Sequence, residues 1–148
     1  MRIKSKRDEI VARRHQTQWA AQFAVASELC KRSYEVAFTS GHTTPIADLM
    51  VVSPVGRKMF LVDVKGLYRK NSWVVRRKAP REDLFYVLAY VPNAEPNQFF
   101  VLSQKQVSAL IRQELKRLGR LDDYSMTGIP WKDAEPYRVE RNGWPLPP

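Results

Sequence analysis

The chain has 148 residues, a length that suits one domain with a sizeable core and is too short to favour two. Lys and Arg number 25 against 15 Asp and Glu, so the formal net charge is +10 and an anionic partner, above all nucleic acid, is expected. No apolar run approaches the roughly 18 residues of a membrane span, and no signal-like N-terminus is present, which predicts a soluble, cytoplasmic protein that does not bind membranes. The only cysteine, Cys30, excludes an intrachain disulfide and a zinc cage of several thiolates.

Residues 1–16 are basic and contain few large apolar side chains, which predicts a loose N-terminal arm. Its cations are Arg2, Lys4, Lys6, Arg7, Arg13 and Arg14. Contact with phosphate groups and simple solvation are equally compatible with this composition.

A helix is expected from Thr17, a suitable N-cap, to Ser33. Its apolar positions at helical spacing are Trp19, Phe23, Ala26 and Cys30, widened by Val25 and Leu29. A lone Cys on such a stripe is expected to be a small buried hydrophobe. A strand over 34–38 and a loop that contains His42 and Pro45 follow. His42 is most simply an ordinary loop histidine, and the alternative is contact with phosphate or metal.

The segment from Asp48 to Lys65 reads as a β-hairpin with unusual charges. Ser53-Pro54-Val55-Gly56 has the residue choices of a type I turn between two apolar runs. If Ser53 pairs with Lys58, the same register places Asp48 opposite Asp63, with Cβ atoms roughly 5 Å apart, and Lys65 on the same face. Like charges in such a position destabilise paired strands unless a divalent cation lies between them. A one-residue bulge would move Asp48 to the other face.

The next segment interleaves basic residues with Tyr68 and Trp73. Basic groups can hold phosphates and aromatic rings can stack on bases, so the segment is a candidate nucleic-acid surface. The candidate residues are Arg69, Lys70, Trp73, Arg76, Arg77 and Lys78. The alternative is a surface strand whose Trp73 packs inward while its charges are solvated.

The sequence of the C-terminal half indicates a hairpin, then a helix, then a tail. The apolar runs 84–91 and 99–102 suggest the hairpin. Ser103 and Gln106 form a capping box for a helix that ends before Gly119. The proline-rich stretch 121–148 is expected to be irregular chain that packs on the core through aromatic rings, which leaves residues 17–120 as the core domain.

In this order of elements, with Asp48 and the triplet Asp63-Val64-Lys65, the chain resembles the PD-(D/E)XK nuclease superfamily, and within it the small members related to Holliday-junction resolvases. The resemblance implies an α/β (α+β) restriction-endonuclease-like fold, with a central mixed β-sheet flanked by helices. It further implies that Asp48 and Asp63 bind Mg²⁺ (or Mn²⁺) and that Lys65 positions and activates the attacking water. Pro45 stands three residues before Asp48 rather than next to it.

The first helix departs from the family pattern. Related sequences carry a metal-site Glu where this chain has Gln22. Gln can ligate magnesium through its carbonyl oxygen but brings no charge. Glu28 lies six residues further on, about 240° around the helix. Either the site works with Gln22, or Glu28 fills the role through a different helix rotation, or activity has been lost.

The preferred hypothesis is a metal-dependent endonuclease that hydrolyses phosphodiester bonds in DNA, with RNA not excluded. The alternatives are a nucleic-acid-binding module of the same fold, which the presence of Gln22 favours, and a basic interaction or ribosome-associated domain in which the charged trio is incidental. The sequence does not decide whether two copies pair as a homodimer to cut both DNA strands.

Overall fold

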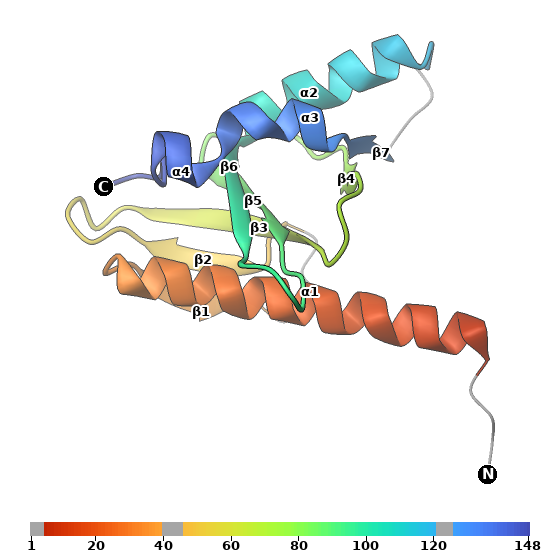
Figure 1. Cartoon of the computed structure of the whole chain (residues 1–148). Coiled ribbons are helices and arrows are strands. Elements are labelled where there is room, and N and C mark those ends of the chain that lie inside the picture. The colour runs from red at the N-terminus through yellow and green to blue at the C-terminus, as the bar shows by residue number, and fades with distance from the viewer. Residues whose placement is uncertain (1–4, 40–45, 121–125) are drawn as a thin grey trace.

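A computed structural model describes residues 5–39, 46–120 and 126–148 (Figure 1). Arg2 and Lys4 of the expected arm, and His42 and Pro45 of the loop before Asp48, lie outside the described residues. No helix in the described ranges is long and apolar enough to cross a membrane.

Within those ranges, five strands form one mixed sheet in the order β1-β2-β3-β5-β6. They are β1 (Glu35–Phe38), β2 (Leu49–Val52), β3 (Met59–Leu67), β5 (Leu84–Tyr90) and β6 (Gln98–Ser103). β3 and β5 are parallel and every other neighbouring pair is antiparallel. The predicted central mixed sheet is therefore confirmed.

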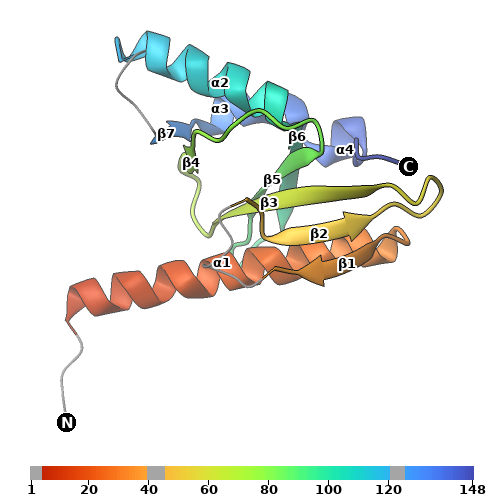
Figure 2. The ribbon, with the colours of Figure 1, turned by 180° about the vertical axis from the view of Figure 1, so that it is seen from behind.

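Helices cover both faces of this sheet (Figures 1 and 2). α1 (Lys6–Lys31) packs Ala21, Val25 and Leu29 against one face, and α2 (Gln104–Arg117) packs an apolar stripe near the other. A two-stranded sheet of β4 (Trp73–Arg76) and β7 (Met126–Ile129) lies on the α2 side. The chain continues through α3 (Trp131–Ala134), the 3₁₀ helix η2 (Glu135–Tyr137) and α4 (Val139–Asn142).

The β2–β3 hairpin has the predicted register. Leu49 pairs with Val62 and Val52 with Met59, and the Ser53 amide donates to the Lys58 carbonyl at 2.9 Å. The Ser53 hydroxyl accepts a second bond, from the Lys58 amide. The described hairpin therefore contains no bulge that would move Asp48 to the opposite face.

The prediction of a loose arm is wrong for residues 6–16, because α1 begins at Lys6. Ser5 and Asp8 form a capping box: the Ser5 hydroxyl accepts from the Asp8 amide, and the Asp8 carboxylate accepts from the Ser5 amide. No Gly or Pro interrupts the following 26 residues, so one helix about 39 Å long results. Its N-terminal part runs past the sheet into solvent (Figures 1 and 2).

The buried face of α1 also differs from the expected stripe. Trp19 and Phe23 are 40% and 58% exposed, and Cys30 is exposed as well. The cause is the close approach of α1 to Gly66, where an added Cβ would lie 2.7 Å from the Cβ of Ala21. Only small side chains fit at that crossing, so the large rings turn outward.

The tail is correctly predicted to dock through its rings but is not irregular. Trp131 stacks on Trp73 with ring centroids 5.1 Å apart, and Trp144 contacts Phe99 at 5.4 Å. The tail forms β7 before Trp131, and three short helical segments between Trp131 and Trp144. Pro130 precedes α3 as its N-cap, a boundary position where proline does not disrupt a helix.

The remaining predicted elements are present. β5 and β6 form the expected antiparallel hairpin. The Ser103–Gln106 capping box opens α2, and Gly119 follows the helix with a φ of +66°, the left-handed conformation that favours glycine.

The contact at Gly66 generates a stability prediction. Gly66→Ala should lower the free energy of unfolding by about 1–3 kcal/mol, because the new methyl group overpacks the α1–β3 interface. The loss should be smaller in an Ala21→Gly background, which removes the nearest clashing atom. Urea unfolding of the four proteins of this double-mutant cycle measures the coupling, and equal losses in both backgrounds would contradict the close-approach explanation.

Candidate active site

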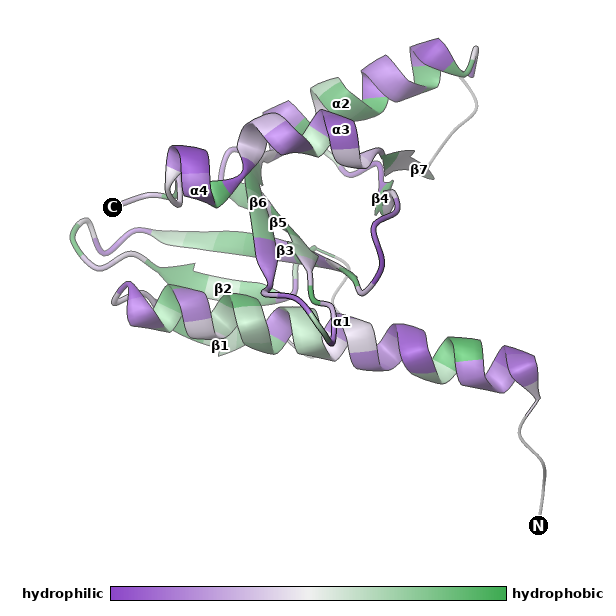
Figure 3. Cartoon of the chain, in the orientation of Figure 1, coloured by the Kyte–Doolittle hydropathy of each residue, from purple (hydrophilic) through white to green (hydrophobic). Residues whose placement is uncertain are grey.

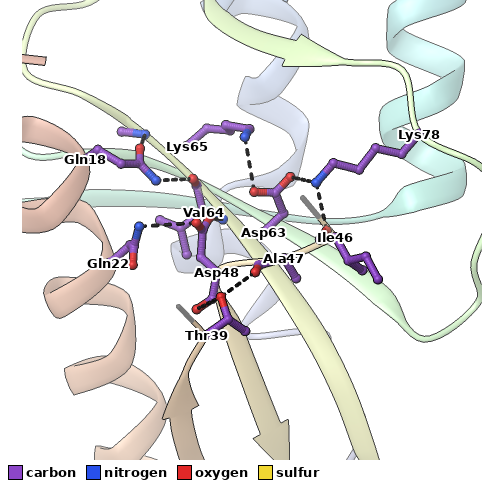
Figure 4. A network of polar contacts seen from close by, with 11 residues as sticks. Gln18, Gln22, Thr39, Ile46, Ala47, Asp48, Asp63, Val64, Lys65 and Lys78 are labelled. Atoms are coloured by element: carbon purple, nitrogen blue, oxygen red, sulfur yellow. Dashed lines mark hydrogen bonds and ion pairs between the residues drawn. The ribbon is translucent and has the colours of Figure 1, made fainter. Parts of the chain in front are cut away.

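The site lies where β3 continues beyond the end of β2. The last β2–β3 pair is Leu49 with Val62, so among the described residues no strand pairs with residues 63–67 of β3 on that edge. A buried backbone amide or carbonyl without a partner is costly. Side chains from the preceding turn and from α1 supply the missing partners (Figure 4).

Asp48 and Gln18 bond to this open edge. An Asp48 carboxylate oxygen accepts from the Val64 amide at 2.8 Å. Gln18 donates to the Val64 carbonyl at 2.8 Å and accepts from the Gly66 amide at 3.3 Å. The backbone of Asp48 is itself fixed, since Thr39 donates to its carbonyl. The first acid is therefore held rigidly against β3.

Gln22 is buried, with 4% exposure, and lies beside Asp48. Its side-chain nitrogen donates to the other Asp48 oxygen at 3.2 Å. It reaches the acid from the same face of α1 as Gln18, four residues earlier. The alternative that uses Glu28 is wrong, because Glu28 pairs with Arg32 at 2.6 Å and Lys31 at 3.3 Å at the far end of α1.

Asp63 is the most buried carboxylate of the site, 2% exposed, and it contacts two ammonium groups. Lys65 Nζ lies 3.1 Å from its Oδ1. Lys78 Nζ lies 2.5 Å from its Oδ2 and also donates to the Ile46 carbonyl at 2.8 Å. The predicted trio of Asp48, Asp63 and Lys65 is thus brought together, and Lys78 joins it from the loop between β4 and β5.

The ionisation of Asp48 depends on burial and on Asp63. Burial, followed by the hydrogen bond and negative charge of Asp63, raises the pKa of Asp48 to about 6. The Val64 amide and the charge of Lys65 act in the opposite direction without cancelling the rise. Two acids that share a partly buried site in this way favour a bound cation.

The donor set fits a divalent cation. Mg²⁺ takes oxygen ligands and is commonly bound through one or two carboxylates, with water and substrate phosphate completing its shell. Here the Lys78 ammonium already contacts a carboxylate oxygen of Asp63 and the carbonyl oxygen of Ile46, so two oxygens of this site already hold a positive charge. In the described part of the chain, no group of three or more His, Cys, Asp or Glu residues could hold a metal, which leaves a site of two carboxylates.

The basic segment after β3 is only partly as predicted. Trp73 is 1% exposed and donates its ring N–H to the Ala89 carbonyl. It packs inward because β4 alternates buried and exposed residues, so it cannot stack on a base. Lys78 belongs to the acid pair. The cations that the structure leaves on the surface are Arg69, Lys70, Arg76 and Arg77.

Tyr68 joins this segment to α1. The guanidinium carbons of Arg13 and Arg69 lie 4.2 and 5.1 Å from the centre of its ring, within the range of cation–π attraction. Two positive charges from distant parts of the sequence are thereby gathered beside the C-terminal end of β3. The part of α1 that precedes Arg13 is largely hydrophilic (Figure 3).

Sequence reasoning missed Gln18, the position of Arg13 beside Tyr68 and the role of Lys78. Gln18 could have been found, because it is one helical turn before Gln22 and therefore on the same face. Arg13 was hidden by the missed start of α1. Lys78 carries no local signal, because only the loop between β4 and β5 brings it to Asp63.

No protein-family model matches the chain, and no curated protein matches it. Among solved structures, it is similar to a bacterial homing endonuclease, I-Ssp6803I, at 17% sequence identity and a TM-score of 0.49. The similarity covers 95% of this chain and 91% of that chain. Likeness at this level supports no conclusion about activity.

The raised pKa of Asp48 generates a pH prediction for the metal-free protein. Between the ordinary pKa of an aspartate and about 6, the folded state binds more protons than the unfolded state, so stability falls as pH rises through this window. Asp48→Asn should remove this loss, roughly 1–2 kcal/mol after allowance for solvent screening.

Urea unfolding in the presence of a chelator, at several pH values, measures the effect. The exposed acid Glu82 offers a matched control, since Glu82→Gln should follow wild type. Parallel profiles for Asp48→Asn and wild type would contradict the proximity of the two acids.

Proposed function

We propose that the protein is a metal-dependent nuclease that hydrolyses phosphodiester bonds in DNA. The observation that carries this proposal is the cluster of Asp48, Asp63 and Lys65 at the end of β3, next to a basic surface. Phosphodiester hydrolysis needs a cation site, a positioned water and positive charge near the phosphate oxygens, and residues of these kinds meet here.

Each side chain has a role in this proposal. Asp48 and Asp63 would hold Mg²⁺ or Mn²⁺, which when bound supplies Lewis-acid activation of phosphate and water. Gln22 positions Asp48 through its 3.2 Å hydrogen bond. Lys65, whose side chain is 28% exposed, keeps its ammonium close enough to the acids to orient a water molecule and to stabilise charge on the phosphate.

Membership of the PD-(D/E)XK superfamily is part of the proposal. The mixed sheet, the acid on the turn into β2 and the Asp-x-Lys triplet on β3 support it. Gln18 and Gln22 occupy the helix face where the family pattern has a Glu. Their side-chain amides hydrogen-bond to β3 and to Asp48 but add no negative charge. The site then has only two carboxylates, which favours one bound metal ion over two.

A second candidate is a module of the same fold that binds nucleic acid without cutting it. Within the described residues no third acid joins Asp48 and Asp63 in a metal-binding group, and two lysines are already paired with Asp63; both facts favour this candidate. The third hypothesis, an incidental trio, is disfavoured because it expects Asp48 and Asp63 on opposite faces, whereas they interact directly. Pairing of two copies remains a prediction from the sequence.

Plasmid nicking tests the choice between nuclease and binding module. Wild type should nick supercoiled plasmid with Mg²⁺ or Mn²⁺ but not with a chelator, and Asp63→Ala should abolish nicking. Gln22→Ala should lower the rate by about 10–100-fold, because it loosens an acid without removing it. Glu82→Gln is the matched control for loss of an acid. Metal-independent nicking, or full activity of Asp63→Ala, would refute the nuclease.

A salt series tests the DNA surface. Affinity for duplex DNA should fall steeply with salt, because a +10 chain binds largely by releasing counterions. Arg13→Ala and Arg69→Ala should each reduce the slope of log affinity against log salt by about 1 if each contacts a phosphate. Lys58→Ala, at the opposite end of β3, should leave the slope unchanged. Fluorescence anisotropy with a labelled duplex measures these slopes, and equal slopes for all four proteins would exclude this surface.

A further inference from the structure

The Lys78 ammonium makes three favourable contacts, more than is usual for a lysine at a protein surface. Its ammonium contacts Asp63 at 2.5 Å and the Ile46 carbonyl at 2.8 Å, and it lies 5.7 Å from the centre of the Tyr86 ring. All three groups present negative charge or electron density to a cation. The lysine side chain is nevertheless 21% exposed, and it comes from a loop rather than from the sheet.

The charges of the site are already balanced. Asp48 and Asp63 bring two negative charges when ionised, and Lys65 and Lys78 bring two positive ones. A divalent cation added to this set would leave a net charge of +2 in a partly buried site, where unbalanced charge is costly. Removal of one ammonium reduces the excess to +1, which one phosphodiester group would neutralise.

Lys78 is the lysine that can leave. Lys65 lies on β3, which pairs with β5 at that residue, so its backbone is fixed and only rotation of its side chain could move its ammonium away from Asp63. Lys78 lies in the segment that connects β4 to β5, outside the five-stranded sheet, and its side chain is partly exposed. Its ammonium also occupies the oxygen-lined position described above, between Asp63 and Ile46.

We infer that Lys78 is a built-in counter-cation: its ammonium takes the place of the metal in the metal-free protein and leaves Asp63 when metal and DNA bind. This inference rests on the proposed nuclease function and adds regulation to it. The metal must displace an ion pair, so it binds weakly to the protein alone. DNA supplies the phosphate that accepts the displaced charge, so metal and DNA bind cooperatively.

Calorimetric titration of Mn²⁺ into the DNA-free protein at neutral pH tests the inference. Lys78→Met removes the competing ammonium, and Lys78→Gln removes its charge but keeps a hydrogen-bond donor. Both variants should bind Mn²⁺ more tightly than wild type, by about tenfold. Melting in the presence of a chelator confirms that they fold, and added Mn²⁺ should raise the melting temperature of both variants more than that of wild type.

Lys58→Met is the matched control. It removes the same charge from an exposed position on the hairpin loop, so it separates local competition from the general effect of net charge. Its Mn²⁺ affinity should equal that of wild type.

The two possible failures are distinguishable. If wild type nicks DNA with Mn²⁺ but both Lys78 variants bind Mn²⁺ no more tightly than wild type, the counter-cation inference is overturned and the nuclease stands. If wild type neither binds Mn²⁺ nor nicks DNA and the Lys78 variants behave identically, both proposals are overturned.

Discussion

The open edge of β3 organises the site. β2 begins only at Leu49, which pairs with Val62, while β3 continues beyond Val62 as the centre of the sheet. The backbone groups of Val64 and Gly66 therefore need partners from elsewhere. Asp48 and Gln18 meet that need. The same hydrogen bonds that satisfy the backbone also fix the first acid beside the second, so the stability of the sheet and the geometry of the site depend on one another.

Charge balance is the second constraint. Asp63 is almost fully buried, and two ammonium groups contact it, which is the condition under which a buried carboxylate is tolerated. Asp63→Asn would therefore leave the Lys65 and Lys78 ammonium groups without their carboxylate partner, in addition to relieving repulsion of Asp48. Replacement of Asp48 is the change that relieves repulsion, because burial and Asp63 already disfavour its ionised form.

Features that depend on residues close in sequence, such as the turn at Ser53 and the register of its hairpin, could be predicted from local sequence patterns. The turn at Ser53 set the hairpin register, and with it the meeting of Asp48 and Asp63. The face of α1 was misjudged because the large rings of Trp19 and Phe23 dominate the pattern, whereas the crossing at Gly66 selects small residues. Lys78 could not be assigned to the site, since its position depends on how the loop between β4 and β5 returns to the sheet.

The hairpin that joins the two acids has a consequence for folding kinetics. It closes around a short loop and can form early, whereas β3 pairs with β5 in parallel across a longer connection and forms late. In this order of folding the acids would meet before Lys78 arrives, and their repulsion would oppose an early native contact of the sheet. This is local frustration at a candidate functional site.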